Sequence, residues 1–220
     1  MTSTEENYLK SIYNIQQQSL DNVASTSLLS NALNTSAPTV TEMLKKLHEK
    51  DLIDYVKYSG ASLTEKGLQL AVILIRKHRL WETFLFKKLK ISWYDIHDIA
   101  EQLEHINSEL LIEKLDEYLQ YPIIDPHGDP IPNAKGEIKP TNKLILAEAP
   151  NEIDLKVIGV ANHQYSFLHH LDQLKLQIDS KIKILEKWEF DNSLVIELDG
   201  NKMYMSKQVA ESIYVTKNII

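Results

Sequence analysis

The sequence predicts a mainly helical chain that ends in a small β domain. Helical spacing of apolar residues dominates the stretch from residue 4 to residue 119. A turn-rich, proline-containing stretch follows at residues 122–132, and after residue 151 the apolar residues occur in short, strand-like runs. These three observations predict two helical regions followed by a separate, barrel-like domain.

Length and composition set the broad class of protein. The 220 residues suffice for one large or two modest domains, and an apolar content of 43% is normal for a chain that buries a core. No apolar run reaches the length of about 18 residues that a membrane span needs, and the N-terminal residues do not resemble a secretory signal. The lack of cysteine excludes disulfides, cysteine-ligated zinc and thiol catalysis. We therefore expect a cytoplasmic protein without a membrane partner.

The net charge of −7 is unevenly distributed along the chain. Residues 1–90 carry an excess of three Lys and Arg over Asp and Glu, whereas residues 91–150 carry an excess of eight acidic residues. The first segment can therefore face phosphates, and the middle segment can attract cations.

Residues 1–66 show the element order of a winged helix-turn-helix. Apolar periodicity predicts helices at residues 4–18, with Thr4 as N-cap, at residues 25–33, and at residues 37–50. Residues 52–58 alternate like a strand, a turn follows at residues 59–61, and Ser62 begins the returning strand. We assign residues 1–66 to a DNA-binding domain of this type.

In that motif the second helix of the pair enters the DNA major groove with its N-terminal residues, and the hairpin lies along the backbone. Small and hydroxyl side chains there can meet base edges, thymine methyl groups and phosphates. The candidates for DNA contact are Ser36, Pro38, Thr39, Thr41, Lys45, Lys46, Lys57 and Tyr58. Helix-turn-helix patterns also serve as protein–protein modules, so the pattern alone leaves that alternative open.

Three further helices are predicted at residues 64–90, 93–105 and 108–119. They carry more apolar surface than a small winged domain needs, which predicts a homodimer with a helical interface. A two-fold dimer of this kind reads a palindromic double-stranded DNA operator. We assign residues 67–132 to a helical metal-binding and dimerisation domain.

Six His and Glu side chains in this domain indicate a metal site. They are His78, Glu82, His97, Glu101, Glu104 and His105. The last four share one face of the helix predicted at residues 93–105, and the first two are one turn apart on the preceding helix. Imidazole accepts first-row metals and carboxylates favour the harder ions, so the set suits a divalent cation. Each pair alone is also compatible with ordinary solvated helix positions.

The chain changes character after a linker that we expect at residues 133–150. Strands are predicted at residues 155–160, 181–185, 193–198 and 202–205, with a hairpin turn at residues 199–201 and a short helix at residues 167–174. This pattern predicts an SH3-like β-barrel at residues 151–220.

Several segments, in this order, resemble the diphtheria toxin repressor and manganese transport regulator family. They are residues 4–13, Ala37-Pro-Thr-Val-Thr41, Leu63-Thr-Glu-Lys-Gly67, Arg76-Lys-His-Arg-Leu-Trp-Glu82, His97 with Glu101-Gln-Leu-Glu-His105, and Asp125-Pro-His-Gly-Asp-Pro-Ile-Pro132. The C-terminal strands are similar to the SH3-like, FeoA-type domain of longer members. The resemblance implies a dimeric, metal-activated transcriptional repressor that shuts off metal-uptake genes.

Carried over by motif, the resemblance implies a main metal site formed by His78, Glu101, Glu104, His105 and Asn7. Iron-type members place a cysteine at the position of Glu101 and manganese-type members a glutamate, which favours Mn²⁺ over Fe²⁺ as cofactor. Asn7 departs from the pattern, because the family has aspartate or methionine there. An amide oxygen can coordinate a hard cation but adds no charge, so Asn7 is either a weak ligand or one that binds through water.

The resemblance also implies an ancillary metal site formed by Glu82, His97, Asp125 and His127. Its contributor from the C-terminal domain stays open among the candidates His163, Gln164 and His169. Asp125 and His127 are equally compatible with a turn-capping role.

The sequence thus predicts a DNA-binding repressor of metal-homeostasis genes that depends on Mn²⁺ or, alternatively, on Fe²⁺, and not an enzyme. Two rival classes are a metal-blind winged-helix regulator and a metalloenzyme. The chain has no His-Glu-x-x-His motif and no conventional catalytic group beside the cluster, which argues against the enzyme.

Overall fold

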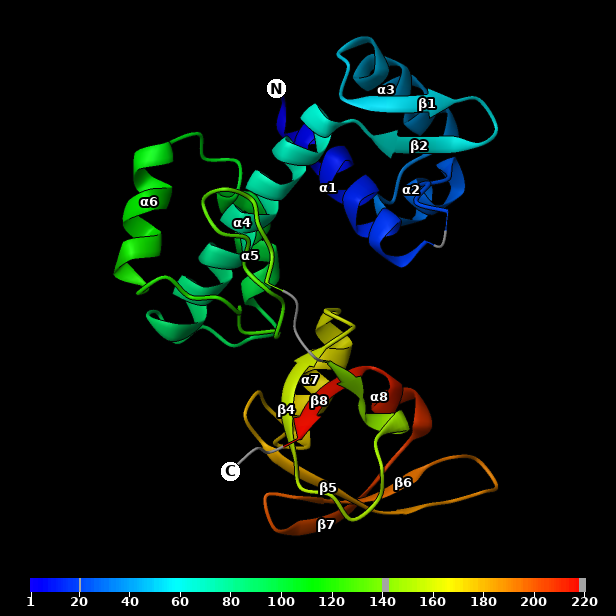
Figure 1. Cartoon of the computed structure of the whole chain (residues 1–220), viewed down its shortest axis with the longest axis vertical. Coiled ribbons are helices and arrows are strands. Elements are labelled where there is room, and N and C mark those ends of the chain that lie inside the picture. Colours follow the sequence, from blue (N-terminus) through cyan, green and yellow to red (C-terminus); the bar gives the residue numbers. More distant parts are fainter. Residues whose placement is uncertain (20, 140–142, 218–220) are drawn as a thin grey trace. The chain divides into compact units, whose positions relative to one another are not determined.

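A computed structural model describes residues 1–19, 21–139 and 143–217 (Figure 1). The chain forms two compact units. Unit 1 consists of Met1–His78, Gln102–Glu109 and Pro132–Glu137, and unit 2 consists of Arg79–Glu101, Leu110–Ile131 and Ile138–Ile220. Helices α4 (Glu65–Lys87) and α5 (Ile96–Leu103) contribute residues to both units.

Unit 1 begins with three helices that are N-capped by hydroxyl side chains. They are α1 (Ser3–Gln18), α2 (Thr26–Ala32) and α3 (Ala37–Glu49). Helix α1 starts earlier than predicted, because Thr2 and Glu5 form a capping box and Thr4 lies inside the helix. Ser25 and Ser36 cap α2 and α3 in the same way, each accepting a hydrogen bond from a backbone N–H three residues later.

A two-stranded hairpin completes the winged helix-turn-helix of unit 1 (Figure 1). Strand β1 (Ile53–Val56) pairs antiparallel with β2 (Gly60–Leu63), in the register that matches Val56 to Gly60. Gly60 has a φ of +125°, and a Cβ there would lie 2.6 Å from the carbonyl oxygen of Ala24. Only glycine therefore allows the hairpin to approach the segment before α2 this closely.

The helical part of unit 2 contains the end of α4, most of α5 and most of α6 (Glu109–Tyr118). Helix α5 is shorter than the predicted helix at residues 93–105. It starts at Ile96, because the chain turns first and the backbone N–H of Ile96 bonds to Ser92. It ends at Leu103, so Glu104 and His105 lie in a turn, and the predicted four-residue stripe of ligands on one helix is wrong.

The rest of unit 2 is an antiparallel sheet with strand order β3-β8-β4-β5-β6-β7 (Figure 1). The strands are β3 (Leu144–Ile145), β4 (Leu155–Val160), β5 (Lys181–Lys187), β6 (Leu194–Leu198), β7 (Asn201–Met205) and β8 (Ile213–Lys217). Helix α7 (Tyr165–Gln173), helix α8 (Lys207–Glu211) and the 3-10 helix η1 (Leu146–Glu148) connect them. Strands β4 and β5 pair through Leu155 with Ile182 and through Lys156 with Lys181.

The predicted fold class, mainly helical with a small β domain, is confirmed. Four of the C-terminal elements, β3, η1, α8 and β8, were not predicted. The end of the expected linker is structured, because Leu144 pairs with Val215 in the sheet. Residues 140–142 of that linker lie outside the described residues. Among the residues that the structure describes, no helix combines the length and apolarity needed to cross a membrane.

Candidate metal centre

Glu104 is the centre of a buried polar cluster in unit 1. Its side chain is fully buried, and its two carboxylate oxygens lie 2.6 and 2.8 Å from Nζ of Lys10. Nδ1 of His78 lies 2.5 Å from one of these oxygens. Burial alone would raise the pKa of Glu104, but the hydrogen bond to His78 and the charge of Lys10 outweigh it and lower that pKa. Glu104 is therefore a buried carboxylate that depends on cationic or hydrogen-bonding neighbours.

His105, the residue after Glu104, contacts a carboxylate of helix α1. Its Nδ1 lies 2.5 Å from Oε2 of Glu6, and its Nε2 lies 3.9 Å from Oε1 of Glu104. Asn7 follows Glu6 on α1, and its Oδ1 is buried with no hydrogen-bond partner among the described residues. A buried amide oxygen without a partner is costly and is a feature expected of an atom that coordinates a cation. The donor chemistry around Glu104 thus fits a hard divalent metal.

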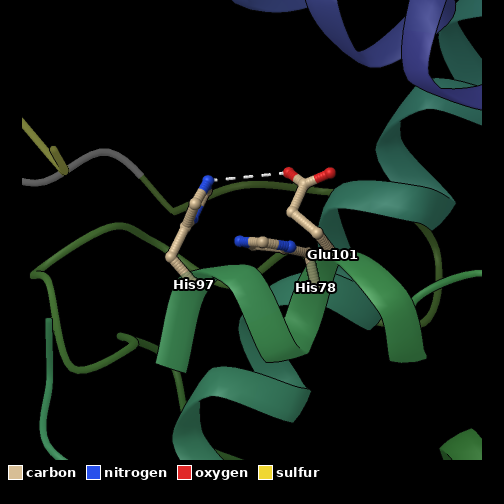
Figure 2. Close-up of side chains that lie close together, drawn as sticks. All are labelled: His78, His97 and Glu101. Carbon is tan, nitrogen blue, oxygen red and sulfur yellow. Dashed lines mark ion pairs between the residues drawn. The ribbon is translucent and has the colours of Figure 1, made fainter. Parts of the chain in front are cut away.

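Glu101 of the predicted main site and His97 of the predicted ancillary site are both half-buried on α5. Nε2 of His97 lies 3.6 Å from Oε1 of Glu101, one turn further along α5. Figure 2 shows these two side chains of α5, together with that of His78 on α4. The main-site prediction thus takes an imidazole nitrogen from His78 and a carboxylate oxygen from Glu101, whereas His97 was predicted for the ancillary site.

A second cluster lies in unit 2 and is fully buried. One ligand atom each from Glu82, Asp125 and His127 lies within 4.8 Å of the other two. Nε2 of His127 lies 2.8 Å from the carbonyl oxygen of Trp93, to which it can donate. Nδ1 of His127 is 3.4 Å from Oε1 of Glu82 and makes no hydrogen bond within the described part of the chain. This arrangement directs the Nδ1 atom toward the two carboxylates, as in a metal-binding histidine.

Two buried carboxylates shift the pKa values in the second cluster. Burial, followed by the charge of Glu82, raises the pKa of Asp125 to about 7. Burial alone would lower the pKa of His127, but the neighbouring Glu82 and the charge of Asp125 raise it to about 9. The charge of Glu82 thus favours a proton on both Asp125 and His127. A divalent cation satisfies the same excess of negative charge, so the donor set fits a metal.

The Asp125–Pro130 loop also has a structural function. Oδ1 of Asp125 accepts hydrogen bonds from the backbone N–H groups of His127, at 2.8 Å, and Asp129, at 2.9 Å. This is the turn-capping role that the sequence left open for Asp125. Oδ2 lies 3.6 Å from Nε of Arg79, so the two oxygens of Asp125 have different neighbours.

His163 is the C-terminal candidate that lies beside this cluster. Its imidazole stacks on that of His127, with ring centroids 4.7 Å apart, and its Nε2 lies 3.6 Å from Oδ2 of Asp129. Burial lowers the pKa of His163 to about 4, against the opposing charge of Asp129. His169 instead contacts the rings of Tyr94 and Tyr165. Gln164 is the exposed N-cap residue of α7.

The sequence analysis missed Glu6 and Lys10, the two α1 side chains that reach the candidate ligands. They stand one helical turn apart, which the sequence shows, but their partners are 94 and 99 residues away along the chain. Pairing over such a distance leaves no local pattern in the sequence.

The predicted DNA-contacting residues lie on exposed parts of the winged domain. Ser36, Pro38 and Thr39 are exposed at the start of α3, and Oγ of Ser36 lies 2.8 Å from Oγ1 of Thr39. The hydroxyl of Thr41 donates to the carbonyl oxygen of Ala37. Lys45 is exposed on α3. At the hairpin, the ammonium of Lys57 lies over the ring of Tyr58, which is 94% exposed.

Lys46 differs from the other predicted DNA contacts because it is paired inside the protein. Its Nζ lies 2.8 Å from Oε1 of Glu5, and Nζ of Lys50 lies 2.7 Å from the same oxygen. The hydrogen bonds from Lys46 and Lys50 lower the pKa of Glu5 to about 2. Glu5 thus joins α1 to α3, one residue before the Glu6 that binds His105.

Three protein-family models match the chain in order. The N-terminal DNA binding domain of the iron dependent repressors matches residues 1–61. The metal binding and dimerisation domain of the same repressors matches residues 64–133, and the FeoA domain matches residues 145–217. The protein is therefore of a class that joins a DNA-binding domain to a helical domain for metal binding and dimerisation.

Individual relatives agree with this class. The iron-dependent repressor IdeR of Mycobacterium tuberculosis is 31% identical over 132 residues, which are 60% of this chain and 56% of that protein. The diphtheria toxin repressor of Corynebacterium glutamicum is 25% identical over 226 residues, covering 99% of this chain and 97% of that protein. A solved manganese-dependent transcriptional repressor in complex with manganese is 32% identical, with a TM-score of 0.87 and coverage of 96% and 99%.

The chain belongs to the family of iron- and manganese-dependent repressors that includes the diphtheria toxin repressor. Members of this family are transcriptional repressors and not enzymes. The metalloenzyme alternative is thereby removed, and the C-terminal sheet is identified as a FeoA-type, SH3-like domain.

Proposed function

We propose that this protein is a transcriptional repressor that binds operator DNA when Mn²⁺ occupies its main site, and that it controls genes of metal uptake and homeostasis in the cytoplasm. The observation that carries this proposal is the fully buried Glu104 carboxylate, surrounded by donors from α1, α4 and the turn after α5. A buried carboxylate is retained where it binds a cation, because burial otherwise favours an apolar residue.

The main site in this proposal comprises His78, Glu101, Glu104, His105 and Asn7. A bound cation supplies the positive charge that carboxylates and imidazoles share. Glu104 and His105 would then bind the cation from the turn after α5. The Oδ1 of Asn7, which has no hydrogen-bond partner among the described residues, would bind it from α1. Because Glu5 ties α1 to Lys46 and Lys50 of α3, fixing α1 also fixes the DNA-reading helix. The site therefore acts on DNA binding through α1.

The donor set favours Mn²⁺. It contains oxygen and nitrogen donors, and the chain has no cysteine that would offer a thiolate. Mn²⁺ stands low in the general affinity order, so its selection depends on hard ligands and geometry. Fe²⁺ accepts the same donors and is the alternative cofactor, in keeping with the iron-dependent relatives.

The ancillary site in this proposal comprises Glu82, His97, Asp125 and His127, and we add His163 as its contributor from the FeoA-type domain. His97 Nδ1 lies 3.3 Å from Glu82 Oε1, and His163 stacks on His127. A cation here would join the α4–α5 region to the C-terminal sheet within unit 2.

A homodimer on a palindromic duplex is the proposed DNA complex. The family includes a dimerisation domain at residues 64–133, and α6 exposes the apolar side chains of Leu110, Leu111 and Tyr118. A two-fold dimer places two copies of α3 on two half-sites. Exposed contacts are expected from Ser36, Pro38, Thr39, Thr41, Lys45, Lys57 and Tyr58, with Lys46 contributing only if it leaves Glu5.

The test is duplex binding by fluorescence anisotropy at fixed salt, with an operator selected from random duplexes in the presence of Mn²⁺. The arms are chelator, Mn²⁺, anaerobic Fe²⁺ and Zn²⁺, and the variants are His105→Ala and, as control, His170→Ala on the exposed face of α7. Tight binding that needs Mn²⁺ and is lost in His105→Ala supports the proposal. An equal or stronger response to Fe²⁺ reassigns the metal. Binding that ignores the chelator, on protein verified as metal-free, contradicts metal dependence.

A further inference from the structure

Lys10 places a second kind of cation at the candidate metal centre. It lies on α1, one turn after Glu6, and only 9% of its surface is exposed. Its ammonium contacts both oxygens of Glu104, at 2.6 and 2.8 Å. Lysine is rarely buried to this extent unless it is paired, and here the pair is formed with the carboxylate at the centre of the cluster.

The geometry makes this ammonium an obstacle to a divalent cation. A metal ion that binds Glu104 needs at least one of the two oxygens that Lys10 already contacts. If the ammonium stayed in place, a single and a double positive charge would lie a few Å apart in a buried environment, where repulsion is poorly screened. Metal binding at Glu104 therefore requires the ammonium to move or to release an oxygen.

We propose that Lys10 is a resident competitor of the metal, which holds Glu104 in the absence of a divalent cation and thereby sets the metal concentration at which the site fills. The inference rests on the proposed function of Glu104 as a main-site ligand. A single positive charge opposes all divalent cations to a similar degree. Lys10 consequently adjusts the threshold of the site, whereas the ligands select the metal.

A different role for Lys10 makes the opposite prediction. If the ammonium kept its contact in the metal-bound state and only oriented the carboxylate, its removal would weaken metal binding. The sign of the change in metal affinity thus decides between a competitor and an orienting partner.

The experiment measures Mn²⁺ affinity in the full-length chain, from the electron paramagnetic resonance signal of free Mn²⁺ during a titration. In Lys10→Met and Lys10→Gln the ammonium is removed, and we expect binding to tighten by at least about tenfold. Lys10→Arg keeps the charge and should bind no more tightly than the wild type. Lys207→Gln is the control, because Lys207 pairs with the exposed Glu211 on α8, outside the main site, and its removal should leave the affinity unchanged.

A second measurement keeps the inference testable if the variants are less stable. Without metal, the loss of Lys10 leaves the buried Glu104 poorly compensated, so Tm should fall. Saturating Mn²⁺ should then raise Tm by more in Lys10→Met than in the wild type, because tighter binding adds more stability.

Unchanged or weaker Mn²⁺ binding in both neutral variants, when Glu104→Gln weakens the Mn²⁺ binding of the wild type, overturns the competitor role alone. If Glu104→Gln leaves Mn²⁺ binding unchanged, or if neither the wild type nor the Lys10 variants bind Mn²⁺, the proposed main site fails and the inference fails with it.

Discussion

The imidazole ring of His163 lies nearly parallel to that of His127, at an interplanar angle of 22° and with ring centroids 4.7 Å apart. His127 belongs to the Asp125–Pro130 loop, and His163 lies between β4 and α7 of the FeoA-type domain. The same loop is tied to β4 through a hydrogen bond from the backbone N–H of Val160 to the carbonyl oxygen of His127. The C-terminal domain therefore contributes both a side chain and backbone contacts to the ancillary cluster.

The first prediction concerns His163 as a ligand of the ancillary site. His163→Ala should weaken metal binding at the ancillary site by roughly 10- to 100-fold and leave the main site occupied. Metal-to-protein ratios after equilibrium dialysis against a series of Mn²⁺ concentrations measure the change. His169→Ala, on the neighbouring helix and in contact with Tyr94 and Tyr165, is the control. Equal losses of metal affinity in both variants would mean that His163 does not act as a metal ligand.

The second prediction concerns metal choice at the main site. Glu101→Cys replaces a hard carboxylate by a soft thiolate, so affinity for Zn²⁺ and Fe²⁺ should rise relative to Mn²⁺. Competition titrations with a metal-binding dye, under anaerobic conditions, give the affinity ratios. A variant whose ratios match those of the wild type would show that Glu101 does not touch the metal.

The third prediction is a dependence of stability on pH. Glu5 has a pKa of about 2 in the folded protein, against an ordinary value of 4.5 in the unfolded chain, so its ion pairs stabilise the fold fully above pH 4.5. This contribution should disappear as the pH falls from 4.5 toward 2. At pH 7, Glu5→Gln should lower the free energy of unfolding by about 1–2 kcal/mol, because Lys46 and Lys50 are half exposed and water screens the pairs.

Urea unfolding of the wild type and Glu5→Gln at pH 7, 5, 4 and 3 measures this contribution. The difference between the two proteins should be constant from pH 7 to 5 and should shrink at pH 4 and 3. If this difference in the free energy of unfolding stayed the same down to pH 3, the charge of the Glu5 carboxylate would not be what stabilises the fold.

The fourth prediction compares two glycines with almost the same backbone conformation. Gly128 has a φ of +87° and Gly200 a φ of +86°. A Cβ on Gly128 would lie 2.0 Å from the carbonyl oxygen of Ile158, whereas nothing lies within 4 Å of a Cβ on Gly200. Gly200→Ala should therefore cost about 1 kcal/mol of stability, and Gly128→Ala at least about 3 kcal/mol.

Calorimetric melting of both variants checks this comparison, with Gly200→Ala as the reference for the backbone conformation alone. Similar melting temperatures for the two variants would contradict the close contact between the loop and β4.

The sequence was sufficient for the fold wherever local signals determine structure. Apolar periodicity and the strand-like runs around the turn at residues 59–61 predicted the winged domain, and short strand-like runs predicted β4, β5, β6 and β7. It failed where tertiary contacts decide. Helix α5 ends at Leu103, and Glu104 and His105 turn away to meet Lys10 and Glu6 of α1. Strand β8 was missed because its five residues are ordered by pairing with β4 and β3.

For the candidate sites as well, local patterns were predictable from the sequence and long-range contacts were not. Residue types and spacing identified the His and Glu candidates, since each lies in a recognisable segment. The choice of His163 among three C-terminal candidates needed the ring stack on His127, which joins residues far apart in the chain. Lys10 was missed for a related reason, because a lysine on an amphipathic helix has no sequence feature that distinguishes a buried pair from a solvated one.

The close approach of Gly128 to Gly159 has a consequence for how such chains evolve. A Cβ on Gly128 would lie 2.2 Å from the Cα of Gly159, and one on Gly159 would lie 3.1 Å from the carbonyl oxygen of His127. Position 128 therefore tolerates no larger residue while β4 is present, whereas at position 159 the loop backbone would have to shift slightly. A lineage that lost its FeoA-type domain would be released from this constraint at position 128. A domain acquired from another gene would instead need glycine at position 128 to pack its strand against this loop.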